Sequence, residues 1–254
     1  HIDTAPIYGF GESEKVIAKA LKGIREKVKI INKSGVSWHS TKRVNMSNDP
    51  VLTIDMLNQS LKRMDTEYFD IYMIHWPDQK VDIRYPLEAL LKEQEKGKII
   101  NIGLCNTNSS DLLKAQEILP ITILQSEFNL FNNGFLGLSN IQKKFTTMGW
   151  GTFDKGILAG TVKEKTTFTS EDARSWAPWW KKSNWKKRVR FCERQKNKYK
   201  IDLKHTALAY SLKHCDKTLI GMKSQKHIDE ICDFKFSLNN PINEDLIDEF
   251  QSFN

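Results

Sequence analysis

YFDIYMIHW, at residues 68–76, is the stretch that decides the fold class. A strand with one face in water alternates apolar and polar residues, but this run is apolar almost throughout. Continuous apolar strands are typical of parallel sheets, which are covered on both faces. A helix is predicted just before it, because Asp49 and Pro50 form an N-cap and first-turn pair, and apolar residues then recur at helical spacing up to Met64.

The same alternation of strand and helix continues on both sides of this stretch. Further strands are predicted at residues 28–33, 98–106, 121–125, 145–150 and 217–221. Further helices are predicted at 13–22 with Ser13 as N-cap, from Pro86 to Gly97, at 109–118, 135–145, 184–199 and 203–214, and from Ser224 onward. Strands and helices that alternate at this spacing indicate parallel βαβ units.

Six side chains at strand ends distinguish a closed barrel from an open doubly wound sheet. In a (β/α)8 barrel the carboxyl ends of the strands form one rim, so these residues would converge on one mouth, whereas an open sheet would not bring all six together. We therefore predict an α/β fold of the (β/α)8 TIM-barrel type. The six residues are Asp3, Lys33, His75, Asn106, Gln125 and Trp150.

Four residues have the chemistry needed to deliver a proton to a carbonyl oxygen. Tyr8 holds a proton at neutral pH and can release it to a developing alkoxide. The ammonium of Lys33 would lower the pKa of this phenol, and the carboxylate of Asp3 would keep the ammonium charged and in place. His75 would orient and polarise the carbonyl through a hydrogen bond. We predict these four residues as the catalytic set.

A proton donor facing a carbonyl needs a hydride donor, which no side chain supplies and a nicotinamide cofactor does. Asn106 and Gln125 offer the acceptor and donor that its carboxamide needs, and Trp150 could stack on the nicotinamide ring. A strand gives way to a helix at residues 223–227, and such a helix start suits a phosphate. We expect Lys223, Ser224 and His227 to bind that phosphate.

Composition restricts the classes of partner and compartment. Lys plus Arg number 39 against 31 for Asp plus Glu, a net charge of +8. The densest basic stretch, 179–200, is interpreted as a solvated helix preceded by a loop, with a nucleic-acid patch as the alternative. No apolar run approaches the ~18–20 residues that cross a bilayer. The four cysteines have no metal-ligand spacing, so we expect no metal and a reduced, cytoplasmic compartment.

Several segments resemble the aldo-keto reductase family, from residue 1 to about residue 231. They are DTAPIYGFGESE (3–14), INKSG (31–35), SLKRMDTEYFDIYMIHWPD (60–78), EKGKIINIGLCN (95–106), LQSEFNL (124–130) and GWGTFDKGILAG (149–160). The resemblance implies a (β/α)8 barrel that reduces an aldehyde or ketone with NADPH. It also implies the same roles for Tyr8, Asp3, Lys33 and His75.

The chain departs from the family pattern at three points that matter here. The family's first strand and helix precede the DTA motif, so we expect residues 1–254 to be a single barrel domain that lacks this βα unit. Cys105 stands where the family usually has serine beside the carboxamide-binding Asn106, and a thiol is the poorer hydrogen-bond donor. The residues at the expected adenosine end leave NAD(H) open beside NADP(H).

Aromatic residues near the same strand ends suggest the substrate. Trp38 and Trp76 lie just past strands, and residues 174–185 carry four more tryptophans. These rings either stack on a sugar-like or aromatic carbonyl substrate or pack within their own loops. The leading prediction is an NAD(P)H-dependent carbonyl reductase that is a monomer or weak homo-oligomer, with no membrane or nucleic-acid partner. The alternative is a non-catalytic barrel that acts as a binding or regulatory module.

Overall fold

The computed structural model describes residues 1–41, 43–138, 145–234 and 242–253. The chain forms two compact units. Unit 1 comprises His1–Ser126 with Phe135–Thr147, and unit 2 comprises Glu127–Gly134 with Met148–Asn254. The assignment of residues 1–254 to a single domain stays a prediction.

Unit 1 contains a parallel sheet built from the predicted strands. They follow the order β1 (Ile2–Asp3), β2 (Ile30–Ser34), β5 (Phe69–Ile74), β6 (Ile99–Cys105) and β7 (Ile123–Asn129), each parallel to its neighbour. All six residues of β5 are buried, as its apolar sequence predicts. The register pairs Lys33 with Met73 and Cys105 with Gln125, so the carboxyl ends of neighbouring strands lie together.

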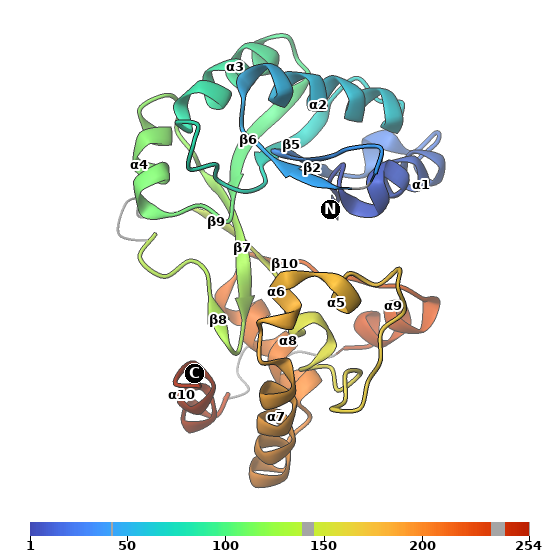
Figure 1. The fold of residues 1–254 in the computed structure, drawn as a ribbon, viewed down its shortest axis with the longest axis vertical. Helices are drawn as coiled ribbons and strands as arrows, with labels where there is room; N and C mark the ends of the chain where they lie inside the picture. Colours follow the sequence, from blue (N-terminus) through green and yellow to red (C-terminus); the bar gives the residue numbers. More distant parts are fainter. Residues whose placement is uncertain (42, 139–144, 235–241, 254) are drawn as a thin grey trace. The chain divides into compact units, whose positions relative to one another are not determined.

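Helices on the outer side of this sheet enclose the core of unit 1 (Figure 1). They are α1 (Glu12–Ala20), α2 (Pro50–Met64), α3 (Arg84–Glu95) and α4 (Ser109–Gln116), with short 3-10 helices η1 (Tyr8–Gly11) and η2 (Arg25–Lys27). Asp49 caps α2 as predicted, accepting a hydrogen bond of 3.0 Å from the backbone N–H of Leu52. The core packs Leu57 of α2 and Leu90 of α3, both 0% exposed, against Tyr72 of β5.

Two local predictions for unit 1 fail in the described residues, and one element was not predicted. Helix α1 begins at Glu12 with Gly11 as N-cap, and Ser13 is not a cap: its hydroxyl shares a 3.0 Å hydrogen bond with that of Thr4. An antiparallel hairpin, β3 (Val36–Trp38) with β4 (Val44–Met46), was not predicted. Of the helix predicted at 135–145, residues 135–138 form turns, 139–144 lie outside the described residues, and Phe145 precedes strand β9.

Unit 2 is mainly helical. Its strands are β8 (Asn132–Asn133), which is antiparallel to the end of β7, and β10 (Lys217–Thr218), which is parallel to β9 (Thr146–Trp150). Its helices are η3 (Asp154–Gly156), α5 (Ala173–Trp176), α6 (Pro178–Lys181), α7 (Trp185–Tyr199), α8 (Leu203–His214), α9 (Gln225–Cys232) and α10 (Glu244–Gln251). Helices α7, α8 and α9 confirm three predicted elements. Within the described residues, none of the helices combines the length and apolarity needed to span a membrane.

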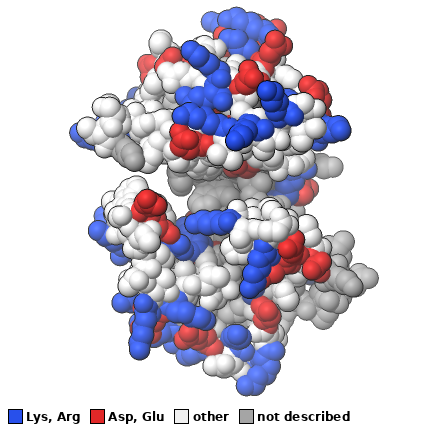
Figure 2. All heavy atoms as spheres, turned by 90° about the vertical axis from the view of Figure 1, so that its right-hand side faces the viewer, with Lys and Arg blue, Asp and Glu red and all other residues white. Residues whose placement is uncertain are grey.

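The basic stretch 179–200 includes α7, and several of its cations have acidic partners within unit 2. Arg188 pairs with Asp154, Arg190 with Glu164, and Lys198 with Glu249. Lys and Arg also lie beside Asp and Glu on the face drawn in Figure 2. This mixed charge favours the interpretation of α7 as a solvated helix, while the absence of a nucleic-acid partner stays a prediction.

Asp70 anchors the start of β5 through a buried carboxylate. It accepts hydrogen bonds from the backbone N–H of Ile30 (2.9 Å) and pairs with Arg25 (3.0 Å) and Lys29 (3.1 Å). Burial by itself raises the pKa of Asp70, but the hydrogen bond from Ile30 and the two cations outweigh it and hold the pKa below its ordinary value. The ionised form is therefore bound more tightly in the folded chain than in the unfolded one.

We expect Asp70→Asn to lower the free energy of unfolding by about 2 kcal/mol at neutral pH. Since the folded-state pKa is depressed, the contribution of Asp70 is complete above its unfolded pKa of about 3.9 and is lost as the pH falls through the folded-state value. Urea midpoints of wild type and variant should therefore converge as the medium becomes acidic. Glu26→Gln removes an exposed carboxylate nearby and serves as control; equal effects of the two variants at neutral pH would contradict the prediction.

Candidate active site

Unit 1 brings together five of the six side chains predicted at strand ends. Asp3 ends β1, Lys33 lies in β2, and His75 directly follows β5. Asn106 follows β6, and its backbone N–H donates to the carbonyl of Gln125 in β7 at 2.8 Å. Parallel strands place these carboxyl ends at one edge of the sheet, which is why residues so distant in sequence meet here.

Lys33 and Asp3 form a buried ion pair at this edge. The Nζ atom of Lys33 lies 2.6 Å from Oδ1 of Asp3 and also donates to the carbonyl of Thr4 at 3.0 Å. The side chain of Lys33 is 0% exposed. Burial lowers the pKa of Lys33, but the charge that Tyr8 acquires when its phenol ionises at high pH, together with the Asp3 carboxylate, raises this pKa more, so the net shift is upward. Lys33 is therefore a fixed cation at neutral pH.

Tyr8 lies next to this cation. Tyr8 as a whole residue is 39% exposed, and the centroid of its ring is 5.3 Å from Nζ of Lys33. The hydroxyl interacts with the same buried ammonium. Burial raises the pKa of Tyr8, and the Lys33 ammonium partly offsets that rise. Tyr8 is thus protonated at neutral pH and has a cation placed to stabilise the phenolate that forms when its proton leaves.

His75 completes the predicted catalytic set. Its ring lies edge-on to that of Tyr8, with centroids 5.9 Å apart and planes at 85°. Burial, with the nearby Lys33 charge, lowers the pKa of His75 to about 3. The imidazole is therefore neutral at physiological pH, and its single N–H can orient a carbonyl without competing for the proton held by Tyr8.

The carboxamides of Asn106 and Gln125 are joined by a thiol. Nδ2 of Asn106 donates to Sγ of Cys105 at 3.2 Å, and this thiol donates to Oε1 of Gln125 at 3.2 Å. Burial raises the pKa of Cys105 to about 12, so the thiol keeps its proton. Nε2 of Gln125 also donates to Oδ2 of Asp3 at 2.7 Å, which the sequence did not predict. Two primary amides side by side fit the donor and acceptor pattern of a nicotinamide carboxamide.

The remaining cofactor candidates belong to unit 2. Trp150 ends β9, and Nζ of Lys155 lies 5.5 Å from the ring centroid of Trp150. Ser224 caps α9 and accepts from the backbone N–H of His227, while the N–H of Lys223 donates to Nδ1 of that histidine at 3.3 Å. Lys223, Ser224 and His227 are all exposed. A hydroxyl, an ammonium and a helix start together fit an anionic phosphate.

The substrate candidates Trp38 and Trp76 both belong to unit 1. Trp76 is 39% exposed and stacks on His75, with centroids 6.4 Å apart. Trp38 ends β3, and its ring lies 5.8 Å from that of Phe10 in η1. Phe10 was not predicted as a site residue; its position between two glycines, two residues after Tyr8, was the available signal.

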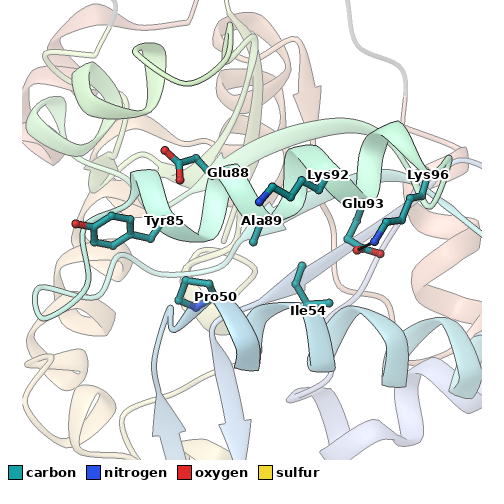
Figure 3. A pocket seen from close by; sticks show the side chains of 8 residues that line it. All are labelled: Pro50, Ile54, Tyr85, Glu88, Ala89, Lys92, Glu93 and Lys96. Carbon is teal, nitrogen blue, oxygen red and sulfur yellow. Dashed lines mark hydrogen bonds and ion pairs between the residues drawn. The ribbon is translucent and has the colours of Figure 1, made fainter.

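A separate groove of about 330 Å³ lies between α2 and α3 on the outer side of unit 1 (Figure 3). None of the predicted site residues lines it, so its chemistry is distinct from that of the strand ends. Its lining residues are Pro50, Ile54, Tyr85, Glu88, Ala89, Lys92, Glu93 and Lys96.

The sequence profile of the Aldo/keto reductase family matches residues 1–254. The chain belongs to this family. Among relatives of this aldo/keto reductase is the Aldo-keto reductase YhdN of Bacillus subtilis, 32% identical over 191 residues, which are 73% of this chain and 57% of the relative. The NADH-specific methylglyoxal reductase of Escherichia coli is 26% identical over 235 residues, 85% of this chain and 71% of the relative.

A solved structure confirms the predicted fold class of this family member. The glycerol dehydrogenase AKR11B4 from Gluconobacter oxydans is similar with a TM-score of 0.79 at 26% identity, and the match covers 98% of this chain and 80% of that chain. By sequence, the match to the B. subtilis relative spans a little over half of that relative's length. An α/β fold of the (β/α)8 barrel type follows from these matches and from the parallel sheet of unit 1.

Proposed function

We propose that this aldo/keto reductase catalyses the NAD(P)H-dependent reduction of an aldehyde or ketone to an alcohol. The observation that carries the proposal is the buried Lys33–Asp3 ion pair directly beside the phenol of Tyr8 and the neutral ring of His75. A structural ion pair alone does not require a phenol and a neutral imidazole next to it. Together these groups suit proton delivery to a carbonyl oxygen.

Each of the four residues has a distinct part in the proposed reaction. The N–H of His75 holds the substrate carbonyl, and Tyr8 gives its proton to the oxygen as negative charge develops there. Lys33 stabilises the resulting phenolate, and Asp3 fixes the position of Lys33. When bound, the nicotinamide cofactor supplies the hydride that reaches the carbonyl carbon.

We propose NADP(H) as the cofactor, with NAD(H) as the alternative that the test must separate. Asn106 and Gln125 would hold the carboxamide and Trp150 would stack on the nicotinamide. Lys223, Ser224 and His227 would bind the phosphate of the adenosine end. The exposed ammonium of Lys223 supports the additional phosphate of NADP(H), whereas one relative is named as NADH-specific.

We propose a small, sugar-like carbonyl compound as substrate. Trp38 and Trp76 offer flat apolar faces of the kind that stack on sugar rings. Relatives named for methylglyoxal and glycerol act on small oxygenated molecules. We also propose a cytoplasmic location, in keeping with four cysteines that are all free thiols.

The test is turnover of NADPH and NADH by the purified chain with methylglyoxal and glyceraldehyde. We expect saturable oxidation of the reduced cofactor, with the lower KM for NADPH. Tryptophan fluorescence would report cofactor binding independently, and Trp150→Ala should weaken the quenching. Cofactor binding without turnover of any aldehyde or ketone would overturn the proposal and favour the non-catalytic module.

A further inference from the structure

Glu14 is a charged residue in an unusual place. It lies in the first turn of α1, and its side chain is 0% exposed. Carboxylates are almost never buried to this degree unless they are paired, because desolvation of an isolated charge is costly. Glu14 has two partners: Oε2 accepts from Nε of Arg63 at 2.5 Å, and Oε1 accepts from Nδ2 of Asn32 at 2.8 Å.

The first partner connects Glu14 to helix α2 and to the aromatic residues beside Tyr8. Arg63 lies in the last turn of α2, where its guanidinium also donates to the hydroxyl of Ser60 at 3.1 Å. The same guanidinium lies 6.0 Å from the ring centre of Trp38, whose edge meets Phe10. Glu14 therefore fixes the orientation in which the Arg63 guanidinium lies near the ring of Trp38, which in turn contacts Phe10.

The second partner connects Glu14 to the strand that carries Lys33. Successive side chains of a strand point to opposite faces, so Asn32 faces the helices and Lys33 faces the site. Oδ1 of Asn32 accepts the backbone N–H of Lys33 at 2.7 Å, while its Nδ2 is held by Glu14. Because Glu14 fixes the Asn32 side chain on the helix side of the sheet, it also helps to fix the backbone of Lys33.

The segment between Tyr8 and Glu14 needs such support because of its backbone. Gly9, Phe10 and Gly11 have φ values of 62°, 55° and 91°, all in the left-handed region. This conformation is unfavourable for a bulky residue such as Phe10 and persists only where neighbouring contacts impose it. A Cβ at Gly11 would come within 3.2 Å of Cδ of Arg63, so the buried ion pair also packs directly against this segment.

We infer that Glu14 is a positioning residue for the acid–base pair. From the helix side of the sheet, it holds both the left-handed segment that carries Tyr8 and, through Asn32, the strand that carries Lys33. This inference rests on the proposed function of Tyr8, and it adds a residue that touches neither substrate nor cofactor. A purely structural role would affect stability without a specific dependence on Tyr8.

A double-mutant cycle with Tyr8→Phe separates these two roles. We expect Glu14→Gln to lower kcat about 10- to 100-fold, because small displacements of catalytic groups have effects of this size. In the Tyr8→Phe background the same change should alter kcat less than about twofold, since the group being positioned is gone. Equal factors in both backgrounds would overturn the inference.

Glu93→Gln provides the matched control in the same unit. Glu93 is a similarly buried carboxylate, but it belongs to α3, and its ion-pair partners are Lys96 and Lys98 at 2.6 Å each rather than Arg63. Both variants should lower the urea midpoint, and only Glu14→Gln should lower kcat strongly. If Glu14→Gln fails to fold, Arg63→Lys keeps the charge but loses the fork geometry, and should show the same dependence on Tyr8.

A readout that needs no cofactor distinguishes failure of the inference from failure of the proposed function. The ultraviolet difference titration of the protein minus its Tyr8→Phe variant isolates the phenol of Tyr8. In Glu14→Gln, release of the segment should return the pKa of Tyr8 from its raised value toward its ordinary value of about 10. An unchanged titration would overturn the inference while leaving the proposed function intact. A shifted titration in a protein without reductase turnover would overturn the proposed function alone.

Discussion

Replacing Tyr8 with phenylalanine is expected to lower kcat for aldehyde reduction about 100- to 10,000-fold, the range typical of a lost general acid. The ring and its edge contact with His75 are retained, so the shape of the site changes little. What disappears is the proton that Lys33 helps to release. Steady-state kinetics with a saturating cofactor measure the loss, and cofactor quenching should stay close to that of the wild type.

Tyr85→Phe is the control for this change. Tyr85 is 59% exposed, lies on α3 and lines the outer groove rather than the strand ends. Its hydroxyl should be dispensable for turnover. If Tyr8→Phe kept kcat within about threefold of the wild type, Tyr8 would not be the proton donor, and another acid would have to be sought.

Replacing Lys33 with methionine is expected to affect both turnover and stability. The substitution leaves the Asp3 carboxylate without its cation, and loss of one partner of a buried pair costs about 3–5 kcal/mol. Turnover should fall because the phenolate of Tyr8 loses the charge that stabilises it. Urea midpoints and kcat measured on the same preparation test both effects.

The pH dependence of this variant has a definite sign. The protonated form of Tyr8 is the active acid, so reduction slows as the pH rises through the pKa of Tyr8. Because the Lys33 ammonium lowers that pKa, Lys33→Met should move the alkaline limb of kcat/KM to higher pH while reducing its plateau. An alkaline limb that stays in place would contradict the coupling between Lys33 and Tyr8.

The stability difference should depend on pH as well. The folded-state pKa of Lys33 is raised, so its contribution is complete below the unfolded value of about 10.4 and is lost as the pH rises through the folded value. The gap between wild type and Lys33→Met should therefore be constant near neutral pH and shrink only in strong alkali. Lys29→Met removes a 61% exposed lysine and should cost far less.

The strand ends of unit 1 were predictable because the sequence carries two local signals, one for a buried strand and one for a helix. The apolar run of β5 indicates a buried parallel strand, and helical spacing with the Asp49 cap marks α2. Once strands are parallel and joined by helices, the geometry of the sheet itself brings Asp3, Lys33 and His75 to one edge. These three residues could therefore be assigned to one edge of the sheet without any information about side-chain contacts.

Where local signals conflicted with packing, the prediction failed. Ser13 has the chemistry of an N-cap, yet its hydroxyl bonds to Thr4 and the helix begins at Glu12. The pairing of β3 with β4 and helix α10 were missed, because short segments are stabilised mainly by what they pack against. The roles of the site residues, in both units, stay predictions until the variants are measured.

The sequence by itself determined the family, the order of the parallel strands and of helices α1 to α4 in unit 1, and the types of side chain at the strand ends, because these depend on local pattern and chain connectivity. Only the tertiary structure decided which polar groups form hydrogen bonds or ion pairs with one another. The thiol of Cys105 between two carboxamides, the hydrogen bond from Gln125 to Asp3, and the burial of Glu14 between Arg63 and Asn32 join residues from different elements. Hydrogen bonds and desolvation act over a few ångströms. Because residues that are far apart in the sequence can lie this close in space, their contacts cannot be inferred from their separation along the chain.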